Sequence, residues 1–169
     1  MKLEDNVRSR ELQQYLYDTG KTIGTAESCT GGRIAEAIIA TSGASMYFKG
    51  GIIAYSDEIK TKLLNIDATL IEECNAVSEE VAVAMVKGAV DALGVTFAVA
   101  STGFAGPGGG TKEIPVGTIW LACGNKDHVI TMKLEEDNGR DVNLGIATTK
   151  SLQLVLDFIK SQSEKSGEL

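Results

Sequence analysis

The segment from Thr25 to Gly32, TAESCTGG, is the feature that most limits how this chain can fold. Residues 22–26 are typical of a β-strand, and the apolar residues after the segment recur at helical spacing: Ile34, Ala35, Ile38 and Ile39. A glycine-containing turn between a strand and a helix indicates an α/β unit. The turn places two potential nucleophiles, Ser28 and Cys29, at a helix N-terminus whose free backbone N–H groups would favour a developing negative charge.

Strand-like and helix-like segments alternate along the rest of the chain. Their patterns predict helices over 4–18, 57–64, 78–93 and 138–160, and strands over 46–56, 95–101, 116–123 and 128–133. Gly50 and Gly51 predict a bulge in the strand over 46–56, and Asn138 is the expected cap of the last helix. The order predicts a single α/β domain over residues 1–169, three-layer α/β/α with a mixed sheet, ending in a frayed polar tail over 161–169.

Charge and composition exclude several classes of protein. The net charge is −7 with no basic cluster, which argues against a nucleic-acid partner. The charged start of the chain does not resemble a signal peptide, and no apolar run approaches the roughly 18 residues of a membrane span. The cysteines, Cys29, Cys74 and Cys123, form no CxxC pair, so the sequence predicts neither a zinc site nor a disulfide framework. We therefore expect a cytoplasmic protein with no membrane partner.

A nucleophilic serine needs a base, and two residues are candidates. A Ser-His-Asp triad would depend on the only histidine, His128, although a lone histidine on a strand is more often structural. Lys60 follows Tyr55 by five residues at a strand-to-helix junction, where both side chains could point towards one pocket. A lysine accepts the serine proton only when its amine is neutral, which requires burial or a nearby cation. Alternatively, Lys60 and Lys62 form the solvated face of a short helix.

Other residues near the turn and in a second glycine-rich segment have two interpretations each. Cys29 is the rival nucleophile or a small residue that fills space behind the turn, and Thr30 and Glu27 support the turn as caps or take part in function. The loop from Thr102 to Gly110 lacks the ending of a P-loop. Its N–H groups could hold a phosphate or carbonyl oxygen, or it is a flexible surface loop.

Four ordered motifs resemble the C-terminal domain family of the competence/damage-inducible protein CinA: AESCTGG, GGIIAYSDEIK, AVSEEVA, and STGFAGPGGG followed by PVGTIW. The resemblance covers about residues 8–160 and points to the stand-alone form of the family. It implies hydrolysis of the carboxamide of nicotinamide mononucleotide to the acid and ammonia, within pyridine-nucleotide salvage. No metal or organic cofactor is implied, and a homodimer or higher homo-oligomer is expected.

The resemblance also implies roles for individual residues. Ser28 would be the nucleophile of a Ser-Lys dyad, Lys60 the general base and Tyr55 a proton relay or orienting group. Substrate and oxyanion contacts would come from the turn, the second loop and a phosphate-side arginine, namely Thr30, Gly31, Gly32, Thr102, Gly103, Gly106, Gly108 and Arg140.

The chain departs from the family pattern at two positions. Asp57 stands where the family commonly has asparagine, and the added carboxylate is expected to raise the pKa of the lysine. Asn143 stands near the position of a frequent second arginine, which is expected to weaken phosphate binding. The alternatives to the hydrolase are a non-catalytic nucleotide-binding or interaction module and an amidase for another small amide.

Overall fold

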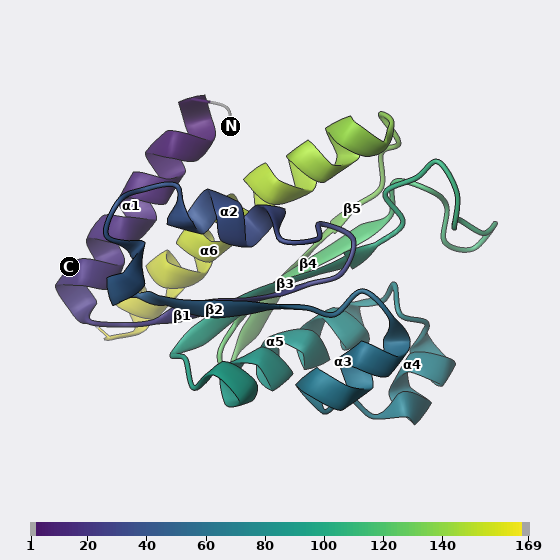
Figure 1. Cartoon of the computed structure of the whole chain (residues 1–169), viewed down its shortest axis with the longest axis horizontal. Coiled ribbons are helices and arrows are strands. Elements are labelled where there is room, and N and C mark those ends of the chain that lie inside the picture. Colours follow the sequence, from purple (N-terminus) through teal and green to yellow (C-terminus); the bar gives the residue numbers. More distant parts are fainter. Residues whose placement is uncertain (1–2, 167–169) are drawn as a thin grey trace.

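The computed structural model describes residues 3–166, which form one five-stranded sheet between two layers of helices (Figure 1). The strand order is β2-β1-β3-β4-β5. The β2–β1 and β1–β3 pairings are parallel, and the β3–β4 and β4–β5 pairings are antiparallel. The bounds are β1 (Ile23–Glu27), β2 (Phe48–Ile53), β3 (Phe97–Gly103), β4 (Ile119–Gly124) and β5 (Val129–Leu134). The predicted mixed sheet is therefore confirmed.

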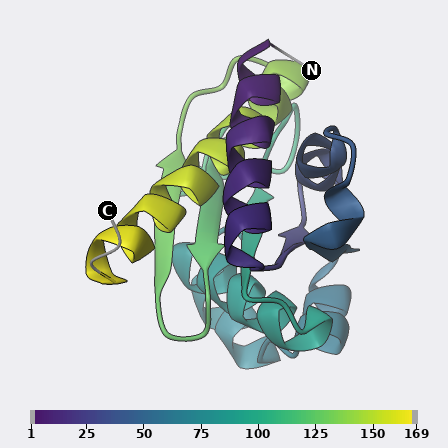
Figure 2. The ribbon, with the colours of Figure 1, turned by 90° about the vertical axis from the view of Figure 1, so that its left-hand side faces the viewer.

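Helices cover both faces of this sheet. One layer holds α1 (Leu3–Thr19), α2 (Arg33–Ile39) and α6 (Arg140–Ser166), with α1 and α6 packed side by side in Figure 2. The other layer holds α3 (Asp57–Leu64), α4 (Ala68–Cys74) and α5 (Glu79–Leu93). Each layer has its own hydrophobic core against the sheet. The architecture is the predicted three-layer α/β/α arrangement.

Local signals account for most element boundaries. Ser78 accepts the backbone N–H of Val81 at 3.2 Å at the start of α5, and Gly94 ends that helix with a left-handed φ of 60°. The pairing of β1 with β2 shifts register at Lys49, so the strand has the predicted bulge one residue before Gly50. The Asn125 side chain accepts two backbone N–H groups in the turn between β4 and β5. Local chemistry therefore determines these ends.

Three details differ from the sequence prediction. The short helices α4 and η1 (Ala44–Met46) were not predicted; Asp67 caps α4 by accepting the N–H of Thr69 at 2.9 Å. Asn138 is not the cap of α6, because the helix begins two residues later, at Arg140; just before it, Asp137 accepts the N–H of Gly139. Helix α6 continues to Ser166 in place of a frayed segment from 161, and residues 167–169 lie outside the described part.

The three parallel strands bring the segments of chemical interest to one edge of the sheet. Their carboxyl ends meet there, and in open α/β sheets this edge is where ligands bind. The Ser28 turn follows β1, the Tyr55–Lys60 segment follows β2, and the Thr102–Gly110 loop begins at the end of β3. The fold therefore gathers segments that are far apart in sequence. Within residues 3–166, none of the helices has the length and apolar character of a membrane span.

Candidate active site

Ser28 lies in a tight turn between β1 and α2. Its N–H donates to the carbonyl of Ser101 on β3 at 2.9 Å, and its own carbonyl accepts the N–H of Gly31 at 3.2 Å. Gly31 and Gly32 have φ angles of 58° and 104°, which glycine adopts without the steric cost that a side chain would add. The two glycines therefore allow the chain to reverse into α2 directly after the serine.

The carboxylate of Glu27 occupies the N-terminus of α2. It accepts the Thr30 hydroxyl at 2.6 Å and the backbone N–H groups of Gly32, Ile34 and Ala35 at 3.0, 3.0 and 2.8 Å. The expectation that the first-turn donors of this helix are open to a developing negative charge is therefore wrong for these three groups. The N–H of Gly32, a predicted substrate contact, is among them.

Two donors beside Ser28 remain available. Within the described residues, no carbonyl or side-chain oxygen accepts the backbone N–H groups of Cys29 and Thr30. They directly follow the serine, as an oxyanion-binding N–H commonly does after a nucleophile. The Thr30 hydroxyl is committed elsewhere, because it donates to Glu27 and lies 2.6 Å from the Ser101 hydroxyl. Thr30 can therefore serve an oxyanion through its backbone and supports the turn through its side chain.

Lys60 reaches Ser28 from α3. Ser56 caps this helix by accepting the N–H of Ile59, so Lys60 lies in the first turn, and its Nζ is 3.2 Å from Ser28 Oγ. The lysine is buried, with 1% of its surface exposed. Burial lowers the pKa of the Lys60 amine, and the Asp57 carboxylate, 3.5 Å away, opposes this effect. The net direction favours a neutral amine, the form that can accept a proton from the serine.

Tyr55 contacts Lys60 through its backbone only. Its carbonyl oxygen accepts from Lys60 Nζ at 3.4 Å, whereas the residue is 62% exposed. No hydrogen bond within the described residues joins the Tyr55 hydroxyl to Ser28 or Lys60, so its relay role stays a prediction. Tyr55 precedes the cap Ser56, while Lys60 follows it in the helix.

The two rival groups are unsuited to the chemistry. Burial raises the pKa of the Cys29 thiol to about 12, so almost none of it is thiolate at neutral pH. His128 stacks on Phe158, with ring centroids 6.1 Å apart. It follows the β4–β5 turn, which the register places beside Ala98 near the start of β3, at the opposite end of the sheet from Ser28. Cys29 fills space behind the turn, and His128 packs.

The second glycine-rich loop begins beside the Ser28 turn, because Ser101 immediately precedes Thr102. The Thr102 hydroxyl donates to the carbonyl of Ala76 at 2.7 Å, and Gly103 ends β3. Arg140 donates to the carbonyl of Gly106 at 2.8 Å, so α6 and the loop are in contact. Gly108 is exposed, with open space where a side chain would stand.

The Asn143 side chain joins this loop to the segment before α6 through hydrogen bonds. Its Nδ2 donates to the carbonyl of Ala105 and to Asp137 Oδ1, each at 3.0 Å, and its Oδ1 accepts the N–H of Asn138 at 2.8 Å. The residue is buried. These bonds leave this side chain committed to the loop and not to a ligand.

Sequence reasoning missed Ser101, which is fully buried on β3 and contacts both the Ser28 backbone and the Thr30 hydroxyl. A hydroxyl near the end of a strand that is otherwise apolar was the available signal. Glu27 was recognised only as a possible support for the turn. The number of its hydrogen bonds depends on how β1 and α2 meet, which the sequence does not display.

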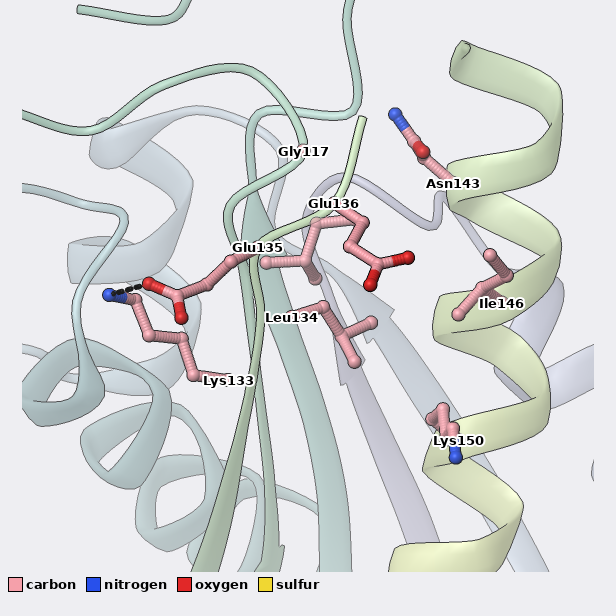
Figure 3. A pocket seen from close by; sticks show the side chains of 9 residues that line it. Gly117, Lys133, Leu134, Glu135, Glu136, Asn143, Ile146 and Lys150 are labelled. Atoms are coloured by element: carbon pink, nitrogen blue, oxygen red, sulfur yellow. Dashed lines mark ion pairs between the residues drawn. The ribbon is translucent and has the colours of Figure 1, made fainter. Parts of the chain in front are cut away.

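Two hollows lie away from Ser28. One, of about 360 Å³, lies between the end of β5 and α6 (Figure 3), where Leu134 and Glu136 extend towards the helix while Lys133 and Glu135 pair with each other at 2.6 Å. The other, of about 470 Å³, lies between α3 and α4 and includes Asp57. Neither is lined by the Ser28 turn, so the catalytic candidates are located by their contacts and not by these cavities.

Comparison with known proteins places these features in context. The profile of the CinA C-terminal domain matches residues 5–159. A CinA-like protein of Citrifermentans bemidjiense is 53% identical over 156 residues, which are 92% of this chain and 38% of that protein. The nicotinamide-nucleotide amidohydrolase PncC of Pseudomonas putida is 45% identical over 130 residues, which are 77% of this chain and 81% of that protein.

The structural comparison gives the same family. The crystal structure of the competence/damage inducible protein CihA from Agrobacterium tumefaciens has a TM-score of 0.88 and 31% identity, covering 93% of this chain and 98% of that one. The CinA superfamily protein from Escherichia coli has a TM-score of 0.86 and 30% identity, covering 92% of each chain. Several curated CinA-like relatives are much longer, and this chain spans between 28% and 35% of their length.

Proposed function

This chain belongs to the CinA C-terminal domain family, and on that premise we propose that it hydrolyses the carboxamide of nicotinamide mononucleotide through a serine acyl-enzyme. A relative that it matches over most of its length is named for hydrolysis of a nicotinamide nucleotide. The observation that carries the proposal is the 3.2 Å contact between Ser28 Oγ and the buried Lys60 Nζ. A nucleophile and base within hydrogen-bond reach are the minimum for such chemistry.

Acylation begins as neutral Lys60 accepts the Ser28 proton and the serine oxygen attacks the carboxamide carbon. The carbonyl oxygen gains the negative charge, and the backbone N–H groups of Cys29 and Thr30 would stabilise it. When the tetrahedral intermediate collapses, the C–N bond breaks and the Lys60 ammonium returns its proton to the departing nitrogen. The products of this half-reaction are ammonia and an ester on Ser28.

Deacylation repeats these steps with water. Lys60 takes a proton from the water, the resulting hydroxide attacks the ester carbon, and the ester C–O bond breaks. The proton then passes from Lys60 to Ser28 Oγ, which restores the serine and releases nicotinic acid mononucleotide. One lysine therefore serves as base and as acid in both halves, which requires its pKa to lie near the working pH.

The charge of the substrate suits this arrangement. The pyridinium ring withdraws electrons from its carboxamide and so eases attack at the carbonyl carbon. Its positive charge also disfavours a second cation at Lys60, and so favours the neutral amine that burial already promotes. In this proposal the phosphate group lies at the Thr102–Gly110 loop near Arg140, which is held on the Gly106 carbonyl.

The test is ammonia release from nicotinamide mononucleotide by the wild type, Ser28→Ala and Lys60→Ala, with neutral amides alongside. We expect both variants to lose the activity. Activity that survives in Ser28→Ala would exclude Ser28 as the nucleophile. Binding of the nucleotide without hydrolysis of any amide would support the non-catalytic module instead, and hydrolysis of another amide alone would change the substrate. A homodimer or higher oligomer is also part of the proposal, and light scattering measures it directly.

A further inference from the structure

Glu27 is a buried carboxylate without a counter-ion. Only 1% of its surface is exposed, and it makes no ion pair within the described residues. A buried charge of this kind is costly unless hydrogen bonds replace its hydration. Glu27 meets that condition with four donors, three backbone N–H groups and the Thr30 hydroxyl. Four donors on one side chain indicate that this carboxylate has a specific role in the structure of the turn.

The contacts of Glu27 join the two ends of the Ser28 turn. The residue is the last of β1, and its acceptors take the first N–H groups of α2, which has no other side-chain cap because Gly32 stands at the cap position. The turn between these ends is therefore closed by the carboxylate. On its far side, the Thr30 hydroxyl continues to Ser101 on β3, since a hydroxyl that donates to Glu27 must accept from the serine.

We propose that Glu27 is a positioning residue for the reaction of Ser28. It holds the turn in the geometry where Ser28 Oγ meets Lys60 Nζ, and it takes the α2 donors so that the oxyanion is left to the Cys29 and Thr30 N–H groups. This inference rests on the proposed function for its kinetic consequence. The geometric claim, that the carboxylate holds the turn closed, can be measured without any substrate.

The carboxylate cannot be replaced without loss of contacts. Of the four donors, three lie on Oε2 and one on Oε1, so glutamine, which has N–H₂ in place of one oxygen, would set that group against at least one backbone N–H. Aspartate keeps the charge but is shorter by one methylene and cannot reach all four. Both substitutions loosen the turn, and they differ in whether the buried charge is kept.

The experiment compares Glu27→Gln and Glu27→Asp with the wild type and with Glu36→Gln. Glu36 lies in the first turn of the same helix and is exposed, so its substitution removes a charge near the helix N-terminus without touching the turn. The first readout is the kcat and KM for nicotinamide mononucleotide. The second is the alkylation rate of Cys29 by iodoacetamide, measured by peptide mass spectrometry. The buried Cys123 serves as the protected reference and the partly exposed Cys74 as the reactive one.

We expect Glu27→Gln to lower kcat by about 10- to 100-fold while KM stays within about twofold. Cys29 alkylation should rise about tenfold or more as the turn opens, while Glu36→Gln leaves both readouts unchanged. If Glu27→Gln does not fold, Glu27→Asp is judged by the same two readouts. Unchanged kcat with Cys29 still protected overturns the inference, as does an equal effect in Glu36→Gln. A wild type that is silent on the nucleotide refutes the proposed function only, because the alkylation measurement still decides the role of Glu27.

Discussion

Replacement of Asp57 by asparagine is expected to move the pH dependence of the proposed hydrolysis to lower pH. The activity needs neutral Lys60, so it rises with pH as the lysine loses its proton. Burial lowers the Lys60 pKa, while the Asp57 carboxylate stabilises the ammonium form and raises it. Removal of that carboxylate takes away the main contribution that opposes burial. The ammonium form then gives up its proton at lower pH, and the rise in activity follows it.

The size of the effect follows from the geometry. Asp57 Oδ1 lies 3.5 Å from Lys60 Nζ, and 62% of the aspartate side chain is exposed. Unit charges at that distance attract by about 1.2 kcal/mol in bulk water, and the aqueous value is appropriate for so exposed a carboxylate. Since about 1.4 kcal/mol corresponds to one pH unit, the midpoint of the profile should fall by up to about one unit.

The assay is kcat/KM for ammonia release from about pH 6 to 10 at low ionic strength. Glu58→Gln is the matched control, because Glu58 is the neighbouring exposed carboxylate on α3 and makes no ion pair with Lys60 in the described structure. The shift of Asp57→Asn should shrink in about 1 M salt. A midpoint that does not move, moves upwards, or moves equally in Glu58→Gln would refute the reasoning.

Three other substitutions test the burial of Lys60, the protonation of Cys29 and the packing of α5 on α3. Lys60→Met should abolish hydrolysis yet stabilise the fold by about 1 kcal/mol, because a buried amine with a lowered pKa destabilises the folded state while protonated. Thermal unfolding checks this: the gain should be present at pH 7 and fade as the pH approaches 10.5, where the unfolded lysine also becomes neutral. Cys29→Ala should retain most of the ammonia release, because the thiol is buried and un-ionised at neutral pH; a loss as large as that of Ser28→Ala would reverse the choice of nucleophile. Gly88→Ala should destabilise the protein by about 1 to 3 kcal/mol in urea unfolding, because the added methyl overlaps the Leu64 carbonyl, and unchanged stability would contradict the tight packing of α5 on α3.

Elements whose signals are local were predictable from the sequence. The α5 helix has its cap, its apolar stripe and its terminal glycine within one continuous stretch, and all three agree. In contrast, α4 is short, and only Ile71 of its residues is buried, so it carries no comparable periodic signal. The Asn138 prediction failed because the helix begins two residues later, at Arg140, after a turn in which Asp137 accepts the N–H of Gly139. The path of that loop decides where the helix begins.

The candidate site was predictable in its residue types and only partly in its geometry. Ser28 and Lys60 are separated by a strand, a helix and a bulge, so their contact depends on the parallel pairing of β1 with β2. The role of Tyr55 could not be read from its spacing to the lysine. The helix cap at Ser56 directs the two residues differently, and spacing alone does not show where a helix begins.

The distance between nucleophile and base depends on two separate packing arrangements. On one side of the sheet, Glu27 fixes the Ser28 turn against α2. On the other side, α3 carries Lys60 and rests on α5, where Gly88 admits the backbone of Leu64 closely. These two packing arrangements lie in different helical layers and share no residue. Disturbance of either layer therefore separates Ser28 from Lys60 without touching the substrate, and kcat should respond before KM.

In a double substitution of Glu27 and Gly88, the effects on stability should be nearly additive because the sites are independent. The effects on kcat should not be additive, because both act on the same 3.2 Å contact.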